Sequence, residues 1–299
     1  MWTIILCISM EVLRSLRTVD GATLGYRLYR EPATTRRLIV LLHGVASNMT
    51  RWSEFVEQTI LTKSWDVLRP DLRGHGESFS RGTLNLEIWC KDLRDILDAE
   101  GYDQALLIGH SLGAQVAIQF AARYPARVTA LAIIDPVFHV ALRGGLRVMA
   151  SLRFIFRILT ECIRLLNKIG LRRRTIPARD LQQLDRETRK NLLDTGKKRE
   201  MIELYSSPWQ DFRFFPIASY LKELLEITRP LPALEKINAP ILALLSSGIT
   251  YTDPGITRRI LDGHPRSETV TVAAHHWPLT ENPEQVRSTI EQWCARLPI

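Results

Sequence analysis

The sequence predicts an α/β fold in which a mostly parallel sheet is flanked by helices. Short apolar runs alternate with segments of helical periodicity along most of the chain. One run, Leu38–Leu42, is apolar throughout, which is typical of a strand buried on both faces. Another, residues 105–108, leads directly into a Gly-x-Ser-x-Gly sequence and an alanine-rich helical segment. The 299 residues suffice to bury a large core.

The first half of the chain reads as a hairpin followed by alternating strands and helices. Residues 12–19 and 24–29 flank Asp20-Gly21, a pair of residues that favours a β-hairpin turn. Helical periodicity covers residues 52–61 and 84–100, and Gly101 is placed to end the second helix. The strands predicted after the hairpin are residues 38–42, 65–69, 105–108 and 128–134.

Strand signals stop near residue 137 and resume after Pro230 and Pro232. Between them we predict helices over residues 145–172 and 178–206. An aromatic cluster follows, which we expect to line the substrate pocket or to form the core of the helical insertion. Its members are Trp209, Phe212, Phe214, Phe215 and Tyr220.

The end of the chain returns to the strand and helix pattern. Residues 241–245 and 269–273 are predicted strands, and residues 283–295 a closing helix with Asn282 as its N-cap. The prediction is therefore a core interrupted by helices. The core comprises residues 1–136 and 231–299, and the helical cap residues 137–230.

The chain is basic, with a formal net charge of +8 and a pI of about 9.5. Much of the charge lies in residues 143–174, where arginine and lysine alternate with large apolar residues. No nucleic-acid-binding motif accompanies it, so we expect no nucleic-acid partner. We expect these apolar side chains to pack over the active site; the alternative is peripheral membrane contact through an amphipathic helix.

The cysteines and the N-terminus bear on the cell compartment. Four cysteines lie far apart without a Cys-x-x-Cys pair, which predicts neither disulfides nor a metal site and favours the cytoplasm. No apolar run is long enough to span a bilayer. Residues 2–8 are apolar but lack a basic start and a cleavage site, so we expect Met10 to be the natural start. A membrane-surface anchor is the alternative.

The sequence Gly109-His110-Ser111-Leu112-Gly113 carries the clearest chemical signal. It joins a predicted strand to a predicted helix, the context of a strained turn that exposes a nucleophilic serine. Glycines two residues to either side avoid collisions in such a turn. Ser111 is therefore the candidate nucleophile.

Several motifs in the expected order strengthen this interpretation. His43-Gly44, the run 71–78 (DLRGHGES), the serine motif at 109–113 and His275-His276-Trp277-Pro278 each follow a predicted strand. Together they resemble the α/β-hydrolase superfamily, in the branch with a helical cap after the sixth strand. The resemblance implies an eight-stranded, mostly parallel sheet and a catalytic triad of serine, acid and histidine.

The resemblance assigns the base and leaves two candidates for the acid. His276 precedes Trp277 where the family usually has Gly-His-Trp, so we prefer it to His275. Asp253 is the carboxylate in the loop after residues 241–245, and we expect it to be the triad acid. Asp135 is the alternative, because some relatives take their acid from the end of the sixth strand.

Two backbone N–H groups are expected to form the oxyanion hole. Leu112 follows the nucleophile at a helix N-terminus, and Val45 follows His43-Gly44. The charged residues of the 71–78 loop are expected to be architectural, because no phosphate-binding helix pattern accompanies its glycines. We expect neither a metal nor a cofactor.

The predicted function is a serine hydrolase that cleaves an ester, thioester or related carbonyl bond of a small, fairly apolar substrate. Two alternatives stay open: a C–C bond hydrolase or perhydrolase on the same scaffold, and a non-catalytic ligand-binding relative. Epoxide hydrolysis is disfavoured, because those relatives carry aspartate where this chain has Ser111.

Overall fold

The computed structural model describes residues 11–30 and 37–298. The expectations for residues 2–8 and for Met10 lie outside these residues. Among the helices described, none is long and apolar enough to cross a membrane.

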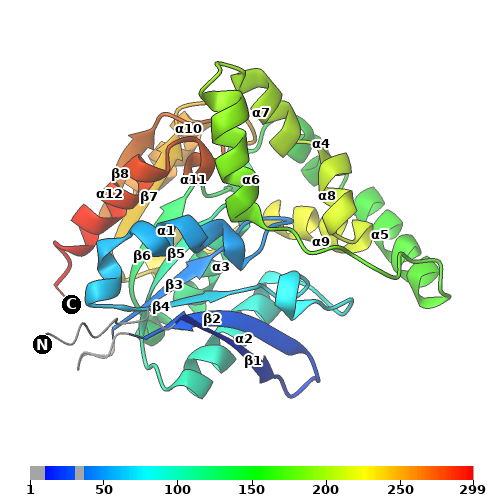
Figure 1. Ribbon diagram of the computed structural model, residues 1–299, viewed down its shortest axis with the longest axis horizontal. Coiled ribbons are helices and arrows are strands. Elements are labelled where there is room, and N and C mark those ends of the chain that lie inside the picture. Colours follow the sequence, from blue (N-terminus) through cyan, green and yellow to red (C-terminus); the bar gives the residue numbers. More distant parts are fainter. Residues whose placement is uncertain (1–10, 31–36, 299) are drawn as a thin grey trace, which may run out of the picture.

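In the part of the chain that the structure describes, eight strands form one sheet in the order β1-β2-β4-β3-β5-β6-β7-β8. β2 pairs antiparallel with β1 and with β4, and all other neighbours are parallel. This confirms the predicted fold class and places the carboxyl ends of β3 to β8 along one edge of the sheet (Figure 1). The strands are β1 (Glu11–Arg17), β2 (Thr23–Tyr29), β3 (Leu38–Leu42), β4 (Asp66–Pro70), β5 (Ala105–His110), β6 (Val128–Ile134), β7 (Ile241–Ser246) and β8 (Ser267–Val272).

Helices cover both faces of the sheet because the central strands are apolar on both sides. β3, β5 and β7 are buried along their whole length. One face packs against α2, α3 and α10, and the other against α1, α11 and α12. These helices are α1 (Ser53–Gln58), α2 (Leu86–Glu100), α3 (Leu112–Arg123), α10 (Pro254–Asp262), α11 (Pro278–Glu281) and α12 (Pro283–Cys294).

A run of helices, which we call the helical segment (residues 137–230), connects β6 to β7 near the carboxyl ends of the strands (Figure 1). Within this segment, α9 packs on the core of the sheet domain through Leu224 and Ile227. The single helix expected over residues 145–172 is two helices that meet at Leu152. The helices are α4 (Gly144–Ser151), α5 (Arg153–Lys168), α6 (Leu181–Thr188), α7 (Lys198–Tyr205), α8 (Pro208–Phe214) and α9 (Ile217–Ile227).

Strained backbone is concentrated at the carboxyl edge of the sheet. Within residues 11–30 and 37–298, the non-glycine residues with positive φ are Ala46 (48°), Ser111 (53°) and Asp135 (45°). They follow β3, β5 and β6, which are neighbours or next neighbours in the sheet. Such conformations are costly for residues with a Cβ and persist where the surroundings enforce them, typically at functional sites.

Candidate active site

Ser111 lies on a sharp turn between β5 and α3, with φ of 53° and ψ of −112°. The turn requires glycine on both sides. A Cβ at Gly109 would lie 2.3 Å from the carbonyl oxygen of Gly113, and one at Gly113 only 2.2 Å from that of Leu42. Glycine therefore allows α3 to pack directly against β5 and β3, which fixes the serine side chain above the sheet edge.

His276 contacts Ser111, although 165 positions separate them in the chain. The Ser111 hydroxyl donates to Nε2 of His276 at 3.2 Å. The neighbouring His275 faces elsewhere: its Nδ1 pairs with Glu281 at 3.0 Å, and its backbone N–H donates to the same carboxylate at 2.8 Å. The geometry therefore favours His276 over His275 as the histidine that acts on Ser111.

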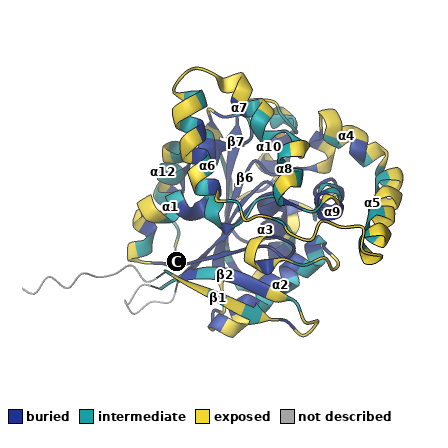
Figure 2. Cartoon of the chain, turned by 45° about the vertical axis from the view of Figure 1, so that its right-hand side comes forward, coloured by how far each residue is buried: buried dark blue, intermediate teal, exposed yellow. Residues whose placement is uncertain are grey.

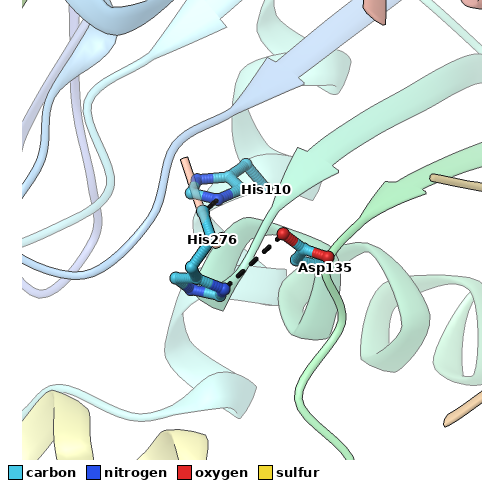
Figure 3. Close-up of side chains that lie close together, drawn as sticks. All are labelled: His110, Asp135 and His276. Carbon is cyan, nitrogen blue, oxygen red and sulfur yellow. Dashed lines mark hydrogen bonds and ion pairs between the residues drawn. The ribbon is translucent and has the colours of Figure 1, made fainter. Parts of the chain in front are cut away.

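Asp135 provides the carboxylate beside His276. Its Oδ2 lies 3.6 Å from Nδ1 of His276 (Figure 3). This is longer than a hydrogen bond, but catalytic pairs often shorten only when substrate binds. The end of β7 holds the carboxylate in place: the Ser246 backbone N–H donates to Oδ1 at 2.7 Å, and the Ser246 hydroxyl donates to Oδ2.

The structure corrects the expected position of the acid. Asp253 is the N-cap of α10, where its carboxylate accepts from the backbone N–H of Ile256 at 3.0 Å. It also forms an ion pair with Arg143. Both contacts lower the pKa of Asp253, the capping bond most. A helix cap followed by proline binds Asp253 to its own helix, so Asp135 takes the position beside the imidazole.

Burial sets the protonation of this pair. Desolvation raises the pKa of Asp135 to about 7, although the Ser246 hydrogen bonds oppose the shift. Desolvation also lowers the pKa of His276 well below its usual value, and the nearby His110 adds to this. Near neutral pH His276 is therefore neutral, the form that accepts a proton from serine.

Aromatic rings enclose the imidazole. Tyr251 packs edge-on against His276 with ring centroids 4.8 Å apart, and Trp277 lies at 5.7 Å. Tyr205 in turn contacts Trp277 at 5.5 Å. Tyr251 lies in the loop that was expected to supply the acid, so this loop packs against His276 instead. Nothing in the sequence of that loop distinguishes Tyr251 from an exposed loop tyrosine.

The loop after β3 approaches Ser111 closely. A Cβ at Gly44 would lie 3.5 Å from Cβ of Ser111 and 3.3 Å from Nδ1 of His110. Val45 lines the same cavity as Ser111, and Leu112 is the first residue of α3, whose leading N–H groups have no acceptor within the helix. The two predicted oxyanion-hole residues therefore flank the serine.

His43 supports this loop rather than facing substrate. Its Nε2 accepts from the backbone N–H of Leu72 at 3.0 Å, and its Nδ1 donates to the carbonyl of Gly44 at 2.9 Å. The side chain is fully buried, and desolvation lowers the pKa of His43 well below its usual value. Both ring nitrogens are therefore committed to ordering the backbone.

Glu223 of α9 ties the helical segment to the same loop. Its Oε2 accepts from the backbone N–H of Ala46 at 3.1 Å, and its Oε1 lies 3.0 Å from Nε2 of His75. Both side chains are fully buried. Burial opposes a charge on His75, but the Glu223 carboxylate outweighs it and raises the pKa of His75. Sequence reasoning missed Glu223, because its partners lie about 150 or more positions away.

A cavity of about 400 Å³ opens over Ser111 and His276. Its lining includes the charged residues Arg51 and Asp211 and the rings of Tyr205, Tyr220 and Tyr251. Of the predicted aromatic cluster only Tyr220 lines the cavity, while the Trp209 side chain is 78% exposed. Most of the remaining wall is apolar and includes Val137, Leu146, Met149, Phe156, Leu221, Leu224 and Ile227.

His110, Asp135 and His276 form a compact cluster whose potential ligand atoms lie within 4.8 Å of one another (Figure 3). The hydrogen bonds account for it without a metal. Nε2 of His110 donates to the carbonyl of His276 at 2.8 Å, and Nε2 of His276 accepts from Ser111. Two of the ring nitrogens are thus already bonded, and His110 positions the backbone of the base.

The chain matches the alpha/beta hydrolase fold family over residues 37–283 and belongs to that family. Its named relatives include a diacylglycerol lipase and a putative esterase/lipase of Haemophilus influenzae.

Individual relatives are distant. An uncharacterized protein of Mycobacterium tuberculosis is 33% identical over 130 residues, which cover 41% of this chain and only 38% of the relative. An sn-1-specific diacylglycerol lipase of Mus musculus is 23% identical over 91% of this chain and 85% of its own length. A thermophilic esterase from Thermogutta terrifontis superposes with a TM-score of 0.66 at 22% identity, covering 97% of this chain and all of the esterase. At that identity the superposition shows the shared fold.

Proposed function

We propose that the protein is a serine hydrolase that cleaves an ester or thioester of an apolar acyl group through an acyl-enzyme. One observation carries the proposal. The hydroxyl of Ser111, held on a strained turn, donates to a buried neutral imidazole at 3.2 Å, and both side chains line a mostly apolar cavity. This is the arrangement that activates a serine for attack on a carbonyl carbon.

Each residue has a role in the proposed reaction. Oγ of Ser111 attacks the carbonyl carbon while Nε2 of His276 takes its proton. Asp135 holds the imidazole by its Nδ1 side and stabilises the imidazolium. The backbone N–H groups of Val45 and Leu112 bind the oxyanion. His276 then returns the proton to the leaving alcohol or thiol, and water deacylates Ser111 by the reverse sequence.

The cavity indicates the kind of substrate. Its volume of about 400 Å³ and its apolar wall suit an acyl chain or aromatic acyl group of moderate size. The Arg51 side chain in the cavity lining is already paired with Asp185 and Thr280, so it is less available to bind a substrate carboxylate. The mouse relative, an sn-1-specific diacylglycerol lipase by name, supports an ester as the substrate.

Labelling and kinetics of a serine variant test the proposal. A fluorophosphonate probe should label the wild-type protein at Ser111 and leave Ser111→Ala unlabelled. Hydrolysis of p-nitrophenyl esters by Ser111→Ala should fall about 10⁴-fold to 10⁶-fold. The exposed Ser247→Ala should behave as wild type in both assays, and circular dichroism should show that all variants are folded.

Two outcomes would contradict the proposal. Full esterase activity in Ser111→Ala would show that Ser111 is not the nucleophile. The lack of both labelling and turnover in the folded wild-type protein would favour a ligand-binding protein that uses the same cavity. Within a series of esters of graded chain length, we expect kcat/KM to rise from acetate to medium-chain esters.

A further inference from the structure

The outer helices of the helical segment expose an unusual amount of apolar surface. On α5 the side chains of Phe154, Ile155 and Leu165 are 74%, 59% and 60% exposed. Figure 2 shows α5 as an exposed helix at the margin of the molecule. The expectation that these side chains pack over the active site holds only for inward residues such as Phe156, which lines the cavity.

The exposed apolar residues of α5 share one face. Phe154, Ile158 and Leu165 follow one another at helical spacing, and Ile155, Leu159 and Leu166 form a parallel row beside them. The opposite side carries Thr160, which is buried. α5 is thus an amphipathic helix whose apolar face is directed to solvent. Val148 of α4, Leu152 between the helices and Ile169 after α5 extend this surface, and we call the whole set the outer face.

The charge beside the outer face has one sign. Residues 137–179 contain ten arginine and lysine residues and a single acidic residue, Glu161. Arg157 and Lys168 lie on α5 next to the apolar rows, where long cationic side chains reach from an apolar surface toward anionic groups. An apolar stripe bordered by cations is the pattern of a helix that lies in the headgroup region of an anionic bilayer.

A cationic pocket adjoins α5 and provides a second, independent observation. It measures about 90 Å³, and five cationic side chains but no acidic one line it: Arg81, Arg164, Lys168, Arg172 and Lys222. Two of these cations are partly neutralised, Arg164 by Glu161 and Lys222 by Glu226. Burial and the neighbouring Arg172 lower the pKa of Arg81, so like charges are crowded at this point. A phosphate group would relieve that crowding.

We propose that the outer face of α4 and α5 is a docking surface for anionic phospholipid bilayers, with lipid phosphates bound along its cationic border. The chemistry favours a bilayer over other occupants. A second copy on a two-fold axis would bring the same cationic border against itself. A nucleic acid would match the charge but would leave the apolar rows in water.

Docking in this manner places the proposed active site next to lipid. Leu146 and Met149 of α4 and Phe156 of α5 line the cavity over Ser111, so these helices separate it from the outer face. An ester dissolved in the bilayer would have a short path to Ser111, a step that rests on the proposed function. The docking itself does not depend on hydrolysis.

Vesicle co-sedimentation tests the docking with the inactive but full-length Ser111→Ala protein. We expect binding to vesicles of phosphatidylcholine with phosphatidylglycerol, little binding to phosphatidylcholine alone, and weaker binding as salt is raised. The pair Phe154→Glu and Ile158→Glu should weaken binding at least tenfold. The matched pair Val19→Glu and Ile60→Glu, at exposed apolar sites on other parts of the chain, should leave it unchanged.

A second pair of variants isolates the cations. Lys168→Gln with Arg172→Gln should weaken binding about tenfold, because each cation near an anionic surface adds to the affinity. The control pair, Arg199→Gln with Arg296→Gln, removes the same charge from exposed sites elsewhere. In the active background, all four pairs should hydrolyse a water-soluble ester at the wild-type rate, which shows that they are folded.

Several results would overturn the docking surface. Equal binding to neutral and anionic vesicles, or unchanged binding in Phe154→Glu with Ile158→Glu, would exclude it. A dimer in lipid-free sedimentation velocity that Phe154→Glu dissociates would identify a second copy as the occupant. Inorganic phosphate that stabilises the protein against heat, without any vesicle binding, would reduce the cationic pocket to a site for free anions.

Discussion

The carboxyl ends of β6 and β7 lie side by side in the sheet, and an aspartate follows each of them. Asp135 follows β6 directly, is buried with φ of 45°, and faces His276. Asp253 comes later in the loop after β7, and caps α10 beside Arg143. The comparison teaches that the carboxylate beside the imidazole is the one that a strand end holds toward it, and in the proposed triad this carboxylate is the acid.

The end of β7 holds in place the carboxylate that follows β6. β7 supplies no acid to the site but ends in Ser246, whose N–H and hydroxyl both donate to Asp135. The strained turn at Asp135 is thus supported by the neighbouring strand. Such support from outside the turn is what a residue with positive φ requires.

The largest expected effect comes from removing the charge of Asp135. Asp135→Asn should lower kcat for ester hydrolysis about 10⁴-fold, because the amide neither stabilises the imidazolium nor fixes the correct tautomer. Asp253→Asn is the matched control and should keep kcat close to wild type. A larger loss of kcat in Asp253→Asn than in Asp135→Asn would identify Asp253 as the acid instead.

The loop after β3 adds a third strand end to the comparison. This loop is held by a helix, α9, instead of by a neighbouring strand. Glu223→Gln should lower kcat about tenfold to a hundredfold with little change in KM, because it removes the charge that pairs with His75 and weakens the acceptor of the Ala46 N–H beside Val45. Glu226→Gln is the matched control. It alters a buried acid on the same helix that accepts from the N–H of Leu86, away from Ser111. Equal kcat losses in both variants would show a general packing effect.

The pH profile sharpens the role of Ser246. Asp135 must be ionised and His276 neutral for base catalysis, so activity should rise with pH as the pair loses its proton near pH 7. Ser246→Ala removes a donor that favours the ionised carboxylate and should move this rise upward by about one pH unit. Ser247→Ala should leave it in place. An unchanged pH profile in Ser246→Ala would show that the ionisation of Asp135 does not cause the rise in activity.

The smallest effect is expected at the β7 loop itself. Asp253→Ala removes the cap of α10 and the ion pair with Arg143, so the thermal midpoint should fall by a few degrees. Esterase kcat measured well below that temperature should not change. A kcat loss without a change in the midpoint would mean that Asp253 acts in catalysis after all.

The sequence was sufficient where local patterns carry the information. The alternating runs predicted each strand to within about two residues, and the glycines around Ser111 predicted the turn, because a Cβ at either position collides with backbone. His276 was identifiable from its place after the last strand. These features depend on neighbours in the chain or on the sheet itself.

The remainder depends on contacts between distant segments. Asp135 precedes Pro136 and resembles an ordinary turn; only its positive φ and the Ser246 contacts distinguish it. The apolar periodicity of α5 predicted an amphipathic helix correctly but not which face is buried. That choice depends on what α9 and the core leave uncovered, which no local pattern records.

The contacts of Glu223 have a consequence for substrate selection. A single carboxylate on α9 accepts from the Ala46 N–H and pairs with His75, so it links α9 directly to the loop beside Ser111. An acyl group bulky enough to push α9 outward would also displace this loop. In the proposed reaction, the Val45 N–H would then be out of place when the tetrahedral intermediate forms. Oversized esters should therefore bind and yet turn over slowly, acting as inhibitors of their smaller counterparts.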